Sequence, residues 1–127
     1  MSASENRELI GRYLQALSGQ TKPASIVAQY VADPVLAEHI GRTEAAFPMY
    51  EIIADELIAE RDIVAVRARF EGTQGADFAG VPASGQTVSV PCMLFYRVAG
   101  GRIVEHWMQF DMAELIKQLQ QPAAAGR

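Results

Sequence analysis

The chain has 127 residues, of which half are hydrophobic and 20% are charged. That length fits one domain of ordinary size with a hydrophobic core. The formal net charge of −4 leaves no basic surface for a phosphate backbone, which excludes nucleic acid as an expected partner. No apolar run approaches the roughly 18 residues of a membrane span. The N-terminus lacks a secretory signal pattern, and a single cysteine excludes an internal disulfide. We therefore expect a soluble, cytoplasmic protein with no membrane partner.

Three helices are predicted in the N-terminal part of the chain. Ser2 begins the first with a capping-box pattern, and the apolar face of this helix runs to Leu17. A short second helix is predicted over residues 23–31. Asp33, followed by a proline, is typical of an N-cap, and the third helix continues from there until Pro48 ends it.

After the third helix the apolar residues recur at every second position, which is typical of strands. Residues 50–59 and 63–71 form one predicted hairpin, and residues 86–98 and 102–111 form another. The glycine-rich segment between the hairpins, residues 72–85, is predicted to be a loop. Helices followed by antiparallel strands with short turns indicate an α+β fold.

The C-terminal part predicts a fourth helix, with Asp111 as its N-cap and Leu119 near its end. No internal repeat divides the chain. Residues 1–121 therefore form one predicted domain. Residues 122–127, which offer nothing to bury, are predicted to be a flexible tail.

The last hairpin determines which side chains share a face. A two-residue turn at Gly100 and Gly101 places Ala99 opposite Arg102, and the register is counted outward from there. One face then holds Val90, Cys92, Leu94, Tyr96, Glu105, Trp107, Gln109 and Asp111. The other holds Pro91, Met93, Phe95, Arg97, His106, Met108 and Phe110. We expect the first face to point inward, because it mixes polar and apolar groups as ligand pockets do. We expect the second to meet another subunit of a homodimer.

The stretch from Glu44 to Leu119 resembles the SnoaL-like polyketide cyclases of the nuclear transport factor two-like superfamily. The matching pieces are Glu44-Ala45-Ala46-Phe47-Pro48, Ile58-Ala59-Glu60, Phe78-Ala79-Gly80-Val81-Pro82-Ala83-Ser84-Gly85, Gly101-Arg102-Ile103-Val104-Glu105-His106-Trp107, and Asp111 with the helix that follows. The resemblance implies a cone-shaped, curved antiparallel sheet covered by N-terminal helices, a cystatin-like α+β barrel. It further implies a dimer and an internal apolar pocket.

Two residues are candidates for catalysis. The resemblance implies that Asp111, at the end of the last strand, acts as acid and base; this requires burial that raises its pKa. The alternative is that Asp111 only caps the helix that it precedes. His106 is a second candidate for proton transfer near neutral pH, and a packed or interface histidine is the alternative.

The candidate substrate-binding residues combine aromatic and hydrogen-bonding side chains. The resemblance implies that Tyr13, from the first helix, lines the pocket. Tyr13 and Gln109 can donate hydrogen bonds to a carbonyl oxygen, and Trp107 is expected in the pocket wall. The full set is Tyr13, Phe47, Tyr96, Trp107 and Gln109. Two distant histidines without a cysteine partner make no zinc site, and no glycine-rich phosphate motif follows a strand, so neither metal nor cofactor is expected.

The resulting functional hypothesis is a cofactor-independent cyclase of the aldol or ester-cyclase type, acting on a small apolar carbonyl compound. Two alternatives remain open, because this fold hosts many activities. One is a non-catalytic dimeric module that binds a small hydrophobic ligand. The other is a different enzyme on the same fold, such as an isomerase or a dehydratase. A buried, pocket-facing acid–base group would favour an enzyme.

Overall fold

The computed structural model describes residues 2–121, and the predicted tail lies outside them. Three helices come first, followed by four strands and a last helix. Their bounds are α1 (Ala3–Leu17), α2 (Ala24–Tyr30), α3 (Pro34–Ala46), β1 (Glu51–Glu60), β2 (Ile63–Thr73), β3 (Thr87–Ala99), β4 (Arg102–Phe110) and α4 (Met112–Leu119). The predicted α+β architecture is confirmed.

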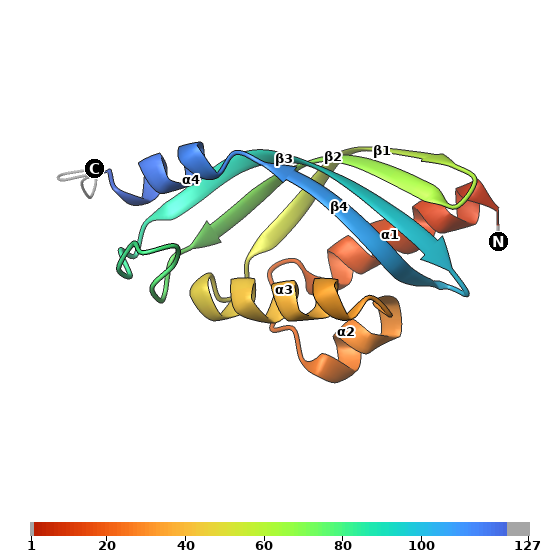
Figure 1. Ribbon diagram of the computed structural model, residues 1–127, viewed down its shortest axis with the longest axis horizontal. Coiled ribbons are helices and arrows are strands. Elements are labelled where there is room, and N and C mark those ends of the chain that lie inside the picture. Colours follow the sequence, from red (N-terminus) through yellow and green to blue (C-terminus); the bar gives the residue numbers. More distant parts are fainter. Residues whose placement is uncertain (1, 122–127) are drawn as a thin grey trace.

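The strands form one antiparallel sheet in the order β1-β2-β3-β4. Figure 1 shows that this sheet is curved, that α1, α2 and α3 lie on its concave side, and that α4 continues past its end. The sheet is open, so the helices rather than further strands cover its inner face. Within residues 2–121, no helix is both long and apolar enough to span a lipid bilayer.

The helices begin where their capping residues predict. The Ser2 hydroxyl accepts a hydrogen bond from the Glu5 N–H, and the Glu5 carboxylate accepts one from the Ser2 N–H, which completes the capping box. Asp33 caps α3 by accepting from the Val35 N–H, and Asp111 caps α4 in the same manner. Each cap satisfies an N–H group that the helix itself leaves without a partner.

The register of the last hairpin differs from the predicted one. Ala99 does pair with Arg102 and Val98 with Ile103, but Arg97 then pairs with Glu105, so Val104 is an extra residue in β4. Such a β-bulge shifts every later residue of the strand to the opposite face. The predicted faces of β4 are therefore wrong beyond Ile103.

The bulge gives β4 a new set of inward side chains. Tyr96 pairs with His106, Leu94 with Met108 and Cys92 with Phe110, all on the side of the helices. Trp107 and Gln109 point to the outer face instead. The phase of β3 is as predicted, since its side chains alternate strictly between exposed and buried.

The outer face of the sheet carries an apolar row between charged rows. Ile58, Ala65, Phe95 and Trp107 are successive cross-strand partners, and Phe95 and Trp107 are each about half exposed. Arg97 lies over the Trp107 ring, 5.8 Å from its centre. The predicted outer residues of β3, such as Met93 and Phe95, do lie on this face, whereas Met108 and Phe110 of β4 face inward.

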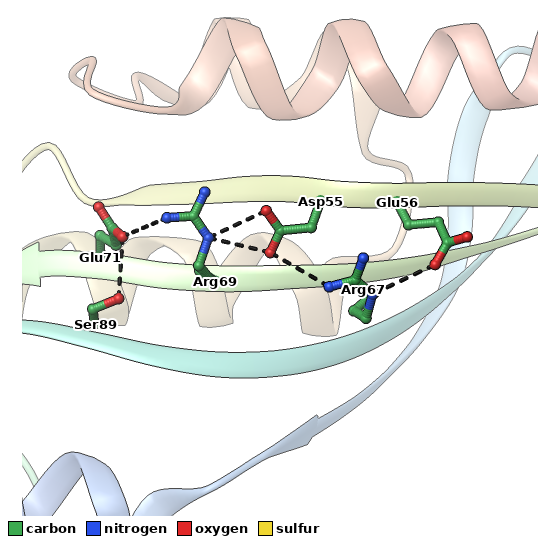
Figure 2. A network of polar contacts seen from close by, with 6 residues as sticks. All are labelled: Asp55, Glu56, Arg67, Arg69, Glu71 and Ser89. Atoms are coloured by element: carbon green, nitrogen blue, oxygen red, sulfur yellow. Dashed lines mark hydrogen bonds and ion pairs between the residues drawn. The ribbon is translucent and has the colours of Figure 1, made fainter.

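Ion pairs extend along one side of the outer row. Figure 2 shows that Arg69 contacts Asp55 and Glu71, and that Arg67 contacts Asp55 and Glu56. These pairs are solvent-exposed, so each contributes at most about 1 kcal/mol to folding. Three carboxylates thus surround two guanidinium groups on this side of the sheet.

Lys22 connects the helical layer to the start of β1. Its side chain is 1% exposed, and its Nζ donates to Glu44 Oε1 at 2.8 Å and to the carbonyl oxygens of Gln20 and Tyr50. Glu44 Oε2 accepts a hydrogen bond from the Met49 N–H. This full set of partners offsets the cost of removing the ammonium group from water.

We propose that the outer row binds a second copy of the chain, because it would otherwise leave a contiguous apolar patch in water. Trp107→Lys should then produce a folded monomer, as measured by sedimentation and circular dichroism. A wild-type chain that is monomeric at micromolar concentration would contradict the dimer.

The register makes a separate prediction for the neighbouring residue. Met108→Lys places a charge on the inner, apolar side of the sheet and should destabilise the fold by at least about 2 kcal/mol. Denaturant unfolding of Met108→Lys beside Trp107→Lys measures the difference. Equal stability of the two variants would argue against the bulge.

Candidate functional site

A cavity of about 80 Å³ lies between the inner face of the sheet and helices α1, α3 and α4. All four strands contribute to it, together with the segment after α3 and the loop after β2. Its lining residues are Tyr13, Leu36, His39, Ile40, Thr43, Phe47, Tyr50, Ile52, Phe70, Phe78, Leu94, Tyr96, Met108, Phe110, Met112 and Leu115. Aromatic and aliphatic side chains dominate, and a few hydroxyl and imidazole groups lie among them.

One wall of the cavity is a cluster of phenylalanine rings. Phe47 meets Phe70 and Phe78 edge-to-face, with ring centres 5.2 and 5.3 Å apart. Phe70 meets Phe110 in the same geometry at 5.7 Å. Rings packed in this way favour a fixed, apolar shape.

Tyrosines supply hydroxyl groups to the cavity. Tyr13 and Tyr96 meet edge-to-face with ring centres 5.7 Å apart, and Tyr50 lies in the same lining. Burial raises the pKa of all three hydroxyls above its ordinary value. The hydroxyls therefore stay protonated at neutral pH and can donate hydrogen bonds to an oxygen.

A histidine–carboxylate pair lies beside the cavity. His106 Nδ1 is 2.9 Å from Asp33 Oδ2, and the two side chains are only 15% and 11% exposed. Desolvation raises the pKa of Asp33, but the hydrogen bonds from His106 and from the Val35 N–H outweigh it, so the pKa lies below its ordinary value. This contact fixes the orientation of the His106 ring relative to α3.

His39, from α3, brings a second imidazole to the cavity itself. Its ring is nearly parallel to that of His106, with centres 6.5 Å apart and 27° between the planes. Burial lowers the pKa of His39, and the charges of His106 and Arg42 lower it further. The ring is thus neutral at neutral pH.

The structure brings three of the predicted site residues into the lining. Tyr13 projects from α1, Phe47 follows α3 and Tyr96 lies on β3. His106 faces the same side of the sheet as Tyr96, its cross-strand partner, and not the outer face to which the predicted register assigned it. The predicted substrate-binding and catalytic roles of these residues stay predictions.

The structure does not bring the other predicted residues to the cavity. Trp107 and Gln109 lie on the outer face because of the bulge at Val104. Asp111 is exposed, and its Oδ1 accepts a hydrogen bond from the Glu114 N–H at 2.9 Å. The predicted inward orientation of these three residues is wrong.

Sequence reasoning missed Asp33 as a site residue and favoured a structural role for His39 over contact with a ligand. Asp33 was recognisable only as a helix cap, since its partner His106 is 73 positions away. His39 flanks the buried face of its helix, which by itself is typical of a structural histidine. Across residues 2–121, no three His, Cys, Asp or Glu side chains gather in a way that could hold a metal ion.

Comparison with known proteins places this geometry in context. The family model described as SnoaL-like polyketide cyclase matches residues 21–119. AclR, a proposed hydroxylase from Streptomyces galilaeus, is 25% identical with a TM-score of 0.80, and the match covers 95% of this chain and 100% of AclR. No curated protein matches the chain in sequence.

Two further solved structures share the fold at lower identity. A SnoaL-like polyketide cyclase from Agrobacterium tumefaciens is 20% identical with a TM-score of 0.74, and the match covers 90% of this chain and 97% of that protein. A protein with a ketosteroid isomerase-like fold from Catenulispora acidiphila is 17% identical with a TM-score of 0.70, with 91% and 94% covered. At these identities the likeness shows the fold alone.

Two substitutions of Asp111 distinguish a role in helix capping from a role in catalysis. Asp111→Asn should keep both stability and turnover, because asparagine caps a helix as well as aspartate does. Asp111→Ala should cost about 0.5–2 kcal/mol of stability. Thermal melts and turnover assays of both variants measure this. Loss of turnover in a stable Asn variant would restore Asp111 as a catalytic candidate.

Proposed function

Because the chain belongs to the SnoaL-like polyketide cyclase family, we propose that it closes a ring in a small neutral carbonyl compound, by an intramolecular aldol or ester-type reaction that needs no cofactor. The observation that carries this proposal is the Asp33–His106 pair beside an apolar cavity. The reaction needs an acid–base group, a donor for the developing oxyanion and a site that folds a flexible chain.

The acid–base chemistry comes from the imidazole groups beside the cavity. A base removes a proton from the carbon next to one carbonyl, the resulting enolate attacks the second carbonyl, and the new alkoxide takes up a proton. A positioned imidazole suits both proton transfers, because its ordinary pKa lies near neutrality. Asp33 fixes the orientation of His106 through the contact between its carboxylate and Nδ1.

The tyrosine hydroxyls suit the developing oxyanion. Tyr13 and Tyr96 lie together in the lining, and both hydroxyls stay protonated because burial raises their pKa. Donors in an apolar cavity act more strongly on a developing charge than donors in water do. They also support an enzyme over the ligand-binding alternative, which a purely hydrophobic lining would favour.

The substrate class follows from the lining. The sixteen lining residues include no Asp, Glu, Lys or Arg. Moving an unpaired carboxylate into such a site is costly, so a neutral ketone or ester is favoured over a substrate that carries a carboxylate. The cavity of about 80 Å³ is small, which favours a compact substrate.

The proposed reaction predicts the effect of removing the pair. The diketone acetonylacetone can close to a five-membered β-hydroxyketone, which loses water to give an enone, and the absorbance of that enone follows the turnover. His106→Gln and Asp33→Asn should each lower the rate at least about tenfold. Asp33→Asn keeps a side chain that can cap the helix, so this variant should still fold. Wild-type rates in both variants would contradict the proposal.

The neutral lining predicts a preference in binding. Methyl levulinate should bind at least about tenfold more tightly than levulinate at pH 7. Only levulinate is an anion and would carry an unpaired charge into the cavity. Calorimetric or nuclear magnetic resonance titration of both compounds measures this preference. Tighter binding of levulinate than of its methyl ester would place the substrate in a different chemical class.

A further inference from the structure

His39 occupies the point where the cavity meets the protein surface. It lines the cavity, and together with Thr43 and Phe78 it also lines a surface hollow between α3 and residues 76–79. Its ring is half-buried. A group in this position can touch a ligand inside and exchange protons with solvent outside.

His39 also differs from His106 in what its ring contacts. Nδ1 of His106 is occupied by Asp33, whereas the His39 ring forms no side-chain hydrogen bond within residues 2–121. The lining includes His39 but not His106. Of the two imidazoles, His39 is therefore the one with nitrogens available to a bound molecule.

The charged groups around His39 favour its neutral form. His106 faces it from β4, Arg42 lies one turn on along α3, and Asp77 lies across the surface hollow. Asp33 is paired with His106 and lies outside the cavity lining. A neutral imidazole can accept a proton, and the cations nearby then favour its release.

We propose that His39 is the catalytic residue that takes the proton from the substrate and returns it, while the Asp33–His106 pair acts through it as a positioning and electrostatic pair. This inference rests on the proposed function and assigns its acid–base step to one residue.

The step balances without an added reactant. A ring nitrogen of His39 takes the proton from the carbon next to the carbonyl, and the electron pair of that C–H bond becomes the enolate. The enolate carbon forms a bond to the second carbonyl carbon, whose oxygen becomes an alkoxide. The His39 imidazolium then gives the proton to this alkoxide, so that no net proton is gained or lost.

Proton exchange of cyclohexanone in deuterium oxide tests the first half-step alone. His39→Gln should slow the catalysed exchange by about 10²–10⁴-fold, the usual contribution of a general base. His106→Gln should slow it less. Val35→Ala, an exposed site on the same helix, should leave it unchanged and serves as the matched control.

Two readouts separate a catalytic His39 from a structural one. Added imidazole should restore part of the exchange in His39→Ala and none in His106→Gln. The acid limb of the wild-type rate should lie below pH 6.5, the ordinary pKa of histidine, and Arg42→Gln should move it to higher pH because a neighbouring cation is lost.

The outcomes distinguish this inference from the proposed function. Wild-type exchange in a folded His39→Gln variant, or rescue by imidazole only in the His106 variant, would overturn the assignment and leave the cyclase proposal standing. No exchange by the wild-type chain, together with no closure of acetonylacetone, would overturn both.

Discussion

The extra residue in β4, Val104, is the constraint on which the site depends. Next to it, the Ile103 carbonyl oxygen accepts hydrogen bonds from the N–H groups of Ala32 and Asp33, at 2.8 and 3.1 Å. These bonds attach the start of α3 to the edge of the sheet. The same bulge turns His106 inward, so the imidazole and the Asp33 carboxylate meet. One irregularity in the strand thus both orients the histidine and places its partner.

The cavity favours neutral forms of its polar groups. Burial raises the pKa of the tyrosine hydroxyls and lowers that of His39, so it favours the uncharged form of both kinds of group. The ionised Asp33 stays outside the lining, where His106 and the first turn of α3 compensate it. Neutral donors and a neutral acceptor in apolar surroundings form strong hydrogen bonds without the cost of a buried ion.

The sequence predicts the elements and part of the site, because their signals are local. Capping residues such as Ser2 and Asp33 mark helix starts. Tyr96 was placed correctly on the inner face, but the polar groups on which that choice rested, Glu105, Gln109 and Asp111, are exposed. The bulge has no such signal: Ile103 and Val104 are both apolar strand formers, and only pairing across the sheet shows which one is extra. The contact between Asp33 and His106 was out of reach for the same reason, since it depends on tertiary structure.

The burial of Lys22 has a chemical consequence. The chain contains two lysines, Lys22 and Lys117, and Lys117 is exposed on α4. An amine-reactive label applied to the folded protein will therefore modify Lys117 and spare Lys22, whose Nζ is enclosed by Glu44 and two carbonyl oxygens. Acylation of Lys22 requires the helical layer to separate from the start of β1. The extent of Lys22 labelling over time therefore measures how often this local opening occurs, with Lys117 as the internal standard in the same chain.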